Sequence, residues 1–203
     1  MTLKINNIFF HLVIAFLISS CASTYSPLTV EEVSLSKTVE GDQISYAYDL
    51  QAFSERVNKR YTKKEENKNL SVVAFELTNN TGDTLRPADD LVFRLNNNVL
   101  KTYNRQESFK LLKQNEIMHL LYFLIAIPAP TSLTTAQLVL KAGLGVVAAN
   151  FSMIKASSAN RKLKAELYEG DILTRKIPDG ETARGIIVFQ GRLFGDIEVS
   201  LKD

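Results

Sequence analysis

Several short segments of the chain alternate between apolar and polar side chains. Residues 44–50 are apolar at every second position, which is the period of two expected of a half-buried strand. Residues 70–78 form a denser apolar run that ends at Asn79-Asn80-Thr81-Gly82-Asp83. Asn and Gly adopt the positive φ angles that tight turns need. We therefore predict two strands here, with a turn after the second.

The same signals return toward the C-terminus. Residues 91–95 are mostly apolar and precede Asn96-Asn97-Asn98, which predicts another turn. Residues 185–189 read as a strand, and residues 197–201 alternate as a last strand. Four side chains are expected to face the core: Phe75, Leu77, Ile186 and Val188. Glu76 should lie on the opposite sheet face, because successive residues of a strand point to opposite sides.

Residues 106–168 have a different pattern, with few strand signals and helix-like apolar pieces. Residues 117–127 are almost wholly apolar, and a second apolar piece covers 133–154. Pro128-Ala129-Pro130 separates them, since proline ends a helix. We predict an inserted helical hairpin over 117–154. Its first arm would reach about 17 Å against a bilayer core of about 30 Å, so we expect the hairpin to fold over the sheets and not to cross a membrane.

The N-terminus has the pattern of an export signal. Residues 8–18 form an apolar run, too short to span a bilayer, and Ile18-Ser19-Ser20-Cys21 follows it. These four residues resemble the bacterial lipobox. The resemblance implies that residues 1–20 are removed as a signal peptide and that Cys21 becomes the lipid attachment site. An ordinary secretory signal and an uncleaved helical anchor are the alternatives.

The residues after Cys21 bear on localisation. They are Ala22-Ser23-Thr24-Tyr25-Ser26, without an acidic residue. By similarity to lipoprotein sorting, this implies a lipoprotein of the bacterial envelope in the outer membrane, facing the periplasm.

A second resemblance concerns the fold. The run Phe75-Glu76-Leu77-Thr78-Asn79-Asn80-Thr81-Gly82-Asp83 and the segment 178–189 are similar to strands and turns of immunoglobulin-like modules in small bacterial envelope lipoproteins. The resemblance implies a mainly β fold with a helical insert: an antiparallel immunoglobulin-like β-sandwich that carries the hairpin. The expected organisation is a signal peptide at 1–20, a lipidated tether at 21–42, and a β-sandwich domain at 43–203 with a helical insertion at about 106–168.

The amino-acid composition excludes some kinds of binding site and cross-link. A single Cys excludes an intrachain disulfide and a multi-cysteine zinc site. The net charge of +2 gives no reason to expect nucleic acid. Residues 54–69 hold six Lys or Arg. We interpret this segment as a solvated loop or short exposed helix; the alternative is a basic face toward anionic lipid head groups.

Three motifs invite catalytic or binding interpretations. Gly143-x-Gly145-x-x-Ala148 superficially fits a dinucleotide fingerprint, but no series of βαβ units surrounds it. Close helix packing is the preferred interpretation, with Gly145, Ala148, Ala149 and Ser152 as a ridge of small residues. His119 has no accompanying nucleophile motif, and Asp89-Asp90 reads as a turn before a strand. We therefore predict no catalytic residues, no cofactor and no metal.

These patterns favour a non-enzymatic, lipid-anchored envelope protein that binds a protein or other ligand in the periplasm. Its expected partners are the lipid bilayer, through acylated Cys21, and an envelope protein. The alternative is a membrane-active or membrane-partner-binding protein that acts through the apolar 117–154 hairpin. A hydrolase with a dispersed site is a third hypothesis.

Overall fold

The computed structural model describes residues 24–50, 52–53, 58–115 and 135–202, and for 135–151 it describes the helix without the side chains. The chain divides into two compact units. One, here called the sheet unit, consists of Ser26–Lys113 and Lys162–Asp203. The other, here called the helical unit, consists of Met1–Tyr25 and Gln114–Arg161.

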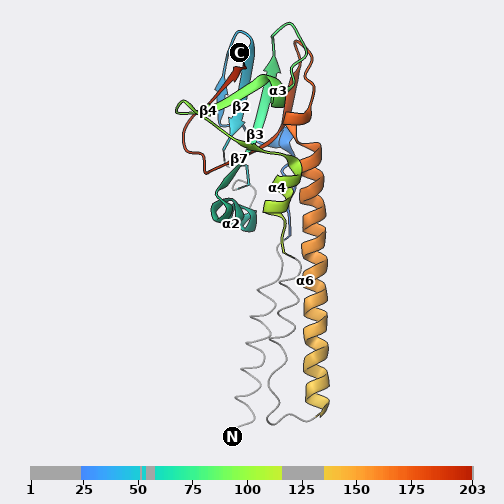
Figure 1. The fold of residues 1–203 in the computed structure, drawn as a ribbon. Coiled ribbons are helices and arrows are strands. Elements are labelled where there is room, and N and C mark those ends of the chain that lie inside the picture. Colours follow the sequence, from blue (N-terminus) through green and yellow to red (C-terminus); the bar gives the residue numbers. More distant parts are fainter. Residues whose placement is uncertain (1–23, 51, 54–57, 116–134, 203) are drawn as a thin grey trace. The chain divides into compact units, whose positions relative to one another are not determined.

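The sheet unit contains two antiparallel sheets (Figure 1). The larger has the strand order β1 (Lys37–Val39), β2 (Ile44–Asp49), β3 (Leu70–Asn79), β7 (Thr182–Gln190), β6 (Thr102–Tyr103). The smaller has the order β5 (Asn98–Val99), β4 (Leu91–Leu95), β8 (Ile197–Leu201). The antiparallel pairing predicted from the sequence is confirmed, but the described part of the fold is mixed, with two antiparallel sheets and four α-helices in place of a mainly β structure. Asn96 and Asn97 both have positive φ, 50° and 64°, as the predicted turn between β4 and β5 requires.

The principal core lies between the two sheets. Phe75 and Leu77 of β3 belong to it, as predicted, and the Phe75 ring packs edge-on against Phe93 of β4 at a centroid distance of 5.7 Å. The prediction for β7 is wrong, because Ile187 and Phe189 face this core. Directly opposed residues of an antiparallel pair share a face, and Val73 of β3 pairs with Ile187.

Ile186 and Val188 are nevertheless buried, on the second face of the larger sheet. Together with Leu167 and Ser108 of the helices they line a small cavity. Strand β7 is therefore covered on both faces, and period-two alternation cannot show which face meets the other sheet. Gly185 permits the close approach on this side, since a Cβ there would lie 2.5 Å from the carbonyl oxygen of Gly170.

Part of the expected tether is folded onto the sheet unit. The 3-10 helix η1 (Val30–Glu32) lies against β7, and Leu28, Val30 and Val33 are buried. Strand β1 then adds an edge to the larger sheet. Residues 28–39 of the expected tether are thus part of the sheet unit, where Leu28, Val30 and Val33 are buried and β1 pairs with β2.

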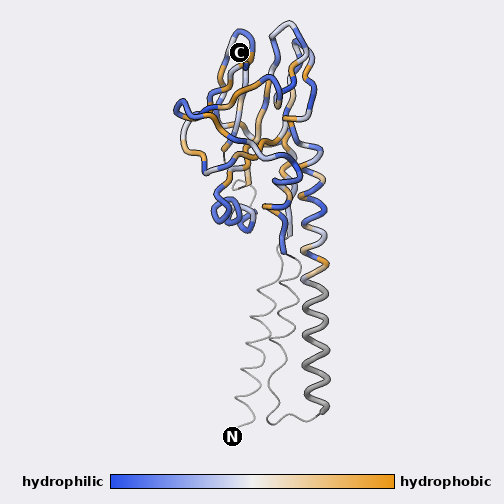
Figure 2. Tube along the Cα trace, viewed as in Figure 1, coloured by the Kyte–Doolittle hydropathy of each residue, from blue (hydrophilic) through white to orange (hydrophobic). Residues whose placement is uncertain are grey.

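Helices occupy the predicted insertion. Strand β6 is followed by α4 (Arg105–Leu112), and α6 (Thr135–Glu169) precedes the 3-10 helix η3 (Ile172–Thr174) and β7. Two further helices, α2 (Lys59–Lys68) and α3 (Pro87–Asp90), lie outside the insertion. Figure 2 shows the hydrophilic character of α2. The first arm of the expected hairpin, at 117–127, lies outside the described residues, whereas the second continues as helix past residue 154 to Glu169.

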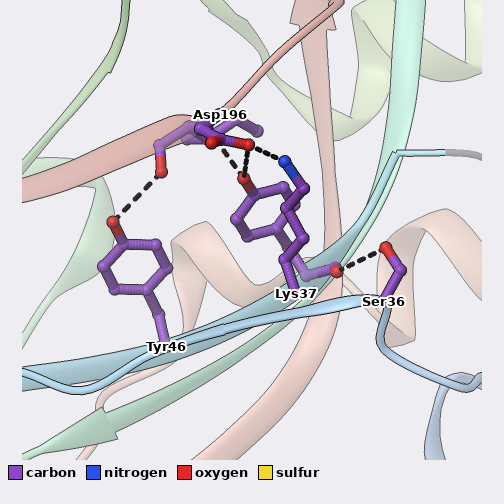
Figure 3. Close-up of polar contacts among 6 residues, drawn as sticks. Ser36, Lys37, Tyr46 and Asp196 are labelled. Atoms are coloured by element: carbon purple, nitrogen blue, oxygen red, sulfur yellow. Dashed lines mark hydrogen bonds and ion pairs between the residues drawn. The ribbon is translucent and has the colours of Figure 1, made fainter.

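Two tyrosines of β2 bind the free edge of β8 (Figure 3). The hydroxyl of Tyr46 donates to the carbonyl oxygen of Ile197 at 3.0 Å and accepts from the Val199 amide at 3.3 Å. The hydroxyl of Tyr48 accepts from the Ile197 amide at 3.0 Å. Burial raises the pKa of Tyr46, against the opposing effect of the Val199 bond. Side chains of one sheet therefore satisfy backbone groups that an edge strand would otherwise leave open.

In the helical unit, Gln114 and Asn160 hold each other by backbone–side-chain hydrogen bonds. The Gln114 amide donates to Asn160 Oδ1 at 2.7 Å, and Asn160 Nδ2 donates to the Gln114 carbonyl at 3.0 Å. Ser152, Ala156 and Ala159 of α6 are buried. Ser152 belongs to the predicted ridge of small residues, and the side chains of the other three ridge residues lie outside the described part of the structure.

Candidate functional site

Three helical segments of the sheet unit lie side by side and form a basic face, defined here as residues 59–68, 105–113 and 162–169. Lys64 of α2 donates to the carbonyl oxygen of Lys113, directly after α4. The ammonium of Lys164 in α6 lies 5.9 Å from the ring centroid of Phe109 in α4 and 5.3 Å from that of Tyr168. The Arg105 guanidinium lies 4.9 Å from the same Tyr168 ring. Cation–π contacts thus join α4 to α6.

Local sequence explains why these segments are helical. Asn104 caps α4 by accepting from the amides of Gln106 and Glu107, and the Glu107 carboxylate accepts from the Asn104 amide in return. Helix α2 ends at Asn69, which has a positive φ of 49°. This is a common way for a helix to stop.

The helices bury few side chains and expose most of their charges. Tyr61, Leu112, Leu163 and Leu167 are buried. The basic face contains ten Lys or Arg and five Asp or Glu. Eight of the ten basic residues are exposed: Lys59, Lys63, Lys68, Arg105, Lys110, Lys113, Lys162 and Lys164.

The remainder of the sheet unit, here called the body (residues 26–58, 69–104 and 170–203), has the opposite charge. It contains ten Lys or Arg and sixteen Asp or Glu. The net charges are therefore +5 on the basic face and −6 on the body. The small net charge of the whole chain hides this separation, which is visible only when three distant segments are brought together.

Burial and the neighbouring positive charges both change the pKa of Lys64. Burial lowers the pKa of Lys64, and the neighbouring cations Arg60, Lys68 and Lys113 lower it further. Desolvation and like charges both disfavour the ammonium form. An anion next to this face would relieve the repulsion, so the arrangement favours binding of a negatively charged surface.

The N-terminal segment joins the sheet unit at the same helices. The Ser26 amide donates to Asn58 Oδ1 at 3.1 Å, and Asn58 Nδ2 donates to the Ser26 carbonyl at 2.8 Å. Asn58 is the residue that precedes α2. The amide of buried Leu28 donates to the carboxylate of Glu166 in α6. The N-terminal segment therefore joins the sheet unit next to the helices of the basic face.

A small cavity lies between α4, the end of α6 and the second face of β7. Its lining includes Arg105, Ser108 and Asp171, and its volume of about 10 Å³ is enough for about one water molecule. Burial raises the pKa of Asp171, while the Leu173 amide and Arg105 act in the opposite direction. Ser108 Oγ has no hydrogen-bond partner among the described residues. The cavity is far smaller than the roughly 300 Å³ or more of a typical ligand pocket.

The structure describes only some of the motifs singled out in the sequence. Cys21 and His119 lie outside the described residues. Gly143 and Gly145 lie inside α6, whereas a dinucleotide fingerprint needs a turn between a strand and a helix. The carboxylate of Asp90 takes part in a local hydrogen bond, which it accepts from the Arg86 amide at 2.6 Å. No group of three His, Cys, Asp or Glu in the described segments could hold a metal ion.

Sequence reasoning treated the basic segment 54–69 by itself, as a solvated loop or short exposed helix or as a face toward anionic lipid head groups. It missed that α4 and the end of α6 lie beside this segment and extend it. Comparisons with known proteins gave no match to any family model, curated protein or solved structure. Among the helices of the described residues, none is long and apolar enough to cross a membrane.

Proposed function

We propose that the chain is a non-enzymatic lipoprotein of the bacterial envelope, anchored by acyl chains on Cys21. The observation that carries this proposal is Ile18-Ser19-Ser20-Cys21 directly after the apolar residues 8–18. The motif combines a core of signal-peptide size, two small residues and a thiol nucleophile at the point of cleavage. More than one acyl chain anchors a protein stably, because each buried CH₂ contributes about 0.8 kcal/mol.

In this proposal the sheet unit is an immunoglobulin-like β-sandwich, and the helical unit contains a helical hairpin inserted into it in the sequence. It binds a protein or other ligand in the periplasm, from the outer membrane. The two antiparallel sheets and the helices between β6 and β7 support the fold assignment.

A second candidate is a membrane-active role for the apolar hairpin at 117–154. One observation favours it: residues 114–161 belong to the helical unit and not to the unit that contains the sheets. An apolar segment outside the core of the sheet unit would be covered by a bilayer or by a membrane partner in this second candidate.

The anchor is tested by Cys21→Ser in bacteria fed labelled palmitate. The wild-type chain should carry the label and be found in the membrane fraction, and the variant should carry none. Ser23→Ala, two residues beyond the thiol, is the matched control and should keep the label. Acyl label on the Cys21→Ser chain would overturn the proposal. The second candidate would be supported if the wild-type chain carried no label, had lost its signal peptide and still resisted alkaline extraction from the membrane.

A further inference from the structure

We propose that the basic face docks onto the anionic surface of the same membrane that holds Cys21. The inference rests on the proposed lipid anchor and adds an orientation to it. In this arrangement α2, α4 and the end of α6 lie against lipid head groups, and the acidic body of the sheet unit points away from them. The partner is the phosphate-rich surface of a bilayer.

Charge complementarity is the first argument. The basic face carries a net charge of +5 and the body −6. An anionic surface attracts the first and repels the second, so both effects favour one orientation. Eight of the ten basic side chains are exposed and can reach head groups. Lipid phosphates would also offset the repulsion among Lys64, Arg60, Lys68 and Lys113, which adds to burial in lowering the pKa of Lys64.

The short chain between the anchor and the fold is the second argument. Leu28, whose amide is bound to Glu166 on α6, is the seventh residue after Cys21. A fully extended chain spans at most about 3.5 Å per residue, so Leu28 cannot lie much more than about 25 Å from the acylated residue. Ser26 is already fixed to Asn58 at the start of α2. The anchor therefore holds the basic face near the bilayer.

The chain path is the third argument. The chain leaves the sheet unit after Lys113 and returns at Lys162, and both residues belong to the basic face. The apolar residues 117–127 and 133–154 lie between these two points in the sequence. The chain therefore enters, leaves and re-enters the sheet unit next to the helices of the basic face.

The aromatic side chains are the fourth argument. Phe109 and Tyr168 are half-buried and lie under the cations of Lys164 and Arg105. Aromatic rings beside Lys and Arg suit a membrane interface, where the rings meet the head-group region and the cations meet phosphate.

The test uses the full-length protein, purified from membranes and reconstituted in two kinds of vesicle. One is phosphatidylcholine alone, and the other is an equal mixture of phosphatidylcholine and phosphatidylglycerol. An amine-reactive acetylating reagent is applied, and modification of each lysine is measured by mass spectrometry. On anionic vesicles we expect Lys59, Lys63, Lys110 and Lys162 to react about fivefold more slowly than on neutral ones. High salt should remove the difference, and Lys101 and Lys176 of the body should react equally on both.

A matched pair of variants separates the basic face from total charge. Lys63→Glu with Lys110→Glu should abolish the slow reaction of Lys59 and Lys162 on anionic vesicles. Lys101→Glu with Lys176→Glu changes the net charge equally and should leave it intact. Equal rates on the two vesicles, or equal protection of body lysines, would overturn the proposal. The mass of the N-terminal peptide reports acylation in the same experiment, so a failed anchor is distinguished from failed docking.

Discussion

A partly buried carboxyl group on α2 makes the stability of the protein depend on pH. The Val72 amide of β3 donates to the Glu65 carboxylate at 2.7 Å. Burial raises the pKa of Glu65 from 4.5 to about 7, although the Val72 bond and Arg192 act in the opposite direction. Desolvation therefore outweighs the hydrogen bond and the nearby guanidinium. Glu65 connects the basic face to the central strand of the larger sheet.

The direction of the effect follows from proton binding. Between pH 4.5 and about 7 the unfolded chain loses the Glu65 proton while the folded protein keeps it. The free energy of unfolding therefore falls as pH rises through this window. Above about pH 7 Glu65 is ionised in both states and causes no further change. A shift of about 2.5 pKa units corresponds to about 3 kcal/mol, an upper limit because water reaches part of the carboxylate.

Glu65→Gln removes the titration and keeps an oxygen that can accept from Val72. We expect the variant to match the wild type near pH 4 and to be more stable at pH 8, by up to about 3 kcal/mol. Urea unfolding followed by circular dichroism, at constant ionic strength from pH 4 to 8, measures this. The control Glu66→Gln removes the same charge from a half-exposed neighbour and should retain the wild-type slope. Parallel profiles for Glu65→Gln and the wild type would refute the reasoning.

Two further substitutions test the packing on each face of the larger sheet. Phe75→Ala empties the space between the sheets and should lower the free energy of unfolding by about 3–5 kcal/mol; Phe194→Ala, whose ring is 69% exposed, should change it by less than about 0.5 kcal/mol. Gly185→Ala would place a Cβ 2.6 Å from Ile172 Cβ, and we expect a loss of about 1–3 kcal/mol. Both are measured by urea unfolding, and an unchanged midpoint for Gly185→Ala would contradict the close approach of η3 to β7.

Strands and turns were predictable because their signals are local. Alternation over 44–50 predicted β2, and the asparagines at 96 and 97 adopt the positive φ that a two-residue hairpin turn requires. The helices that the structure describes in the insertion, α4 and α6, were also predictable, since apolar runs without strand signals favour helix. The Cys21 motif is readable for a different reason: it is a linear signal recognised before folding, and it remains a prediction.

Tertiary structure decided which surfaces these elements share. Period-two alternation divides β7 into two faces, but the faces were assigned by the smaller sheet on one side and by η3 and the helices on the other. The burial of Glu65 depends on α2 lying beside β3, and no local pattern reveals it. The basic face combines segments up to about a hundred residues apart. The sequence by itself determined the elements, because backbone preferences act over a few residues; the burial and charge of each face depend on contacts between distant segments, which only the folded chain defines.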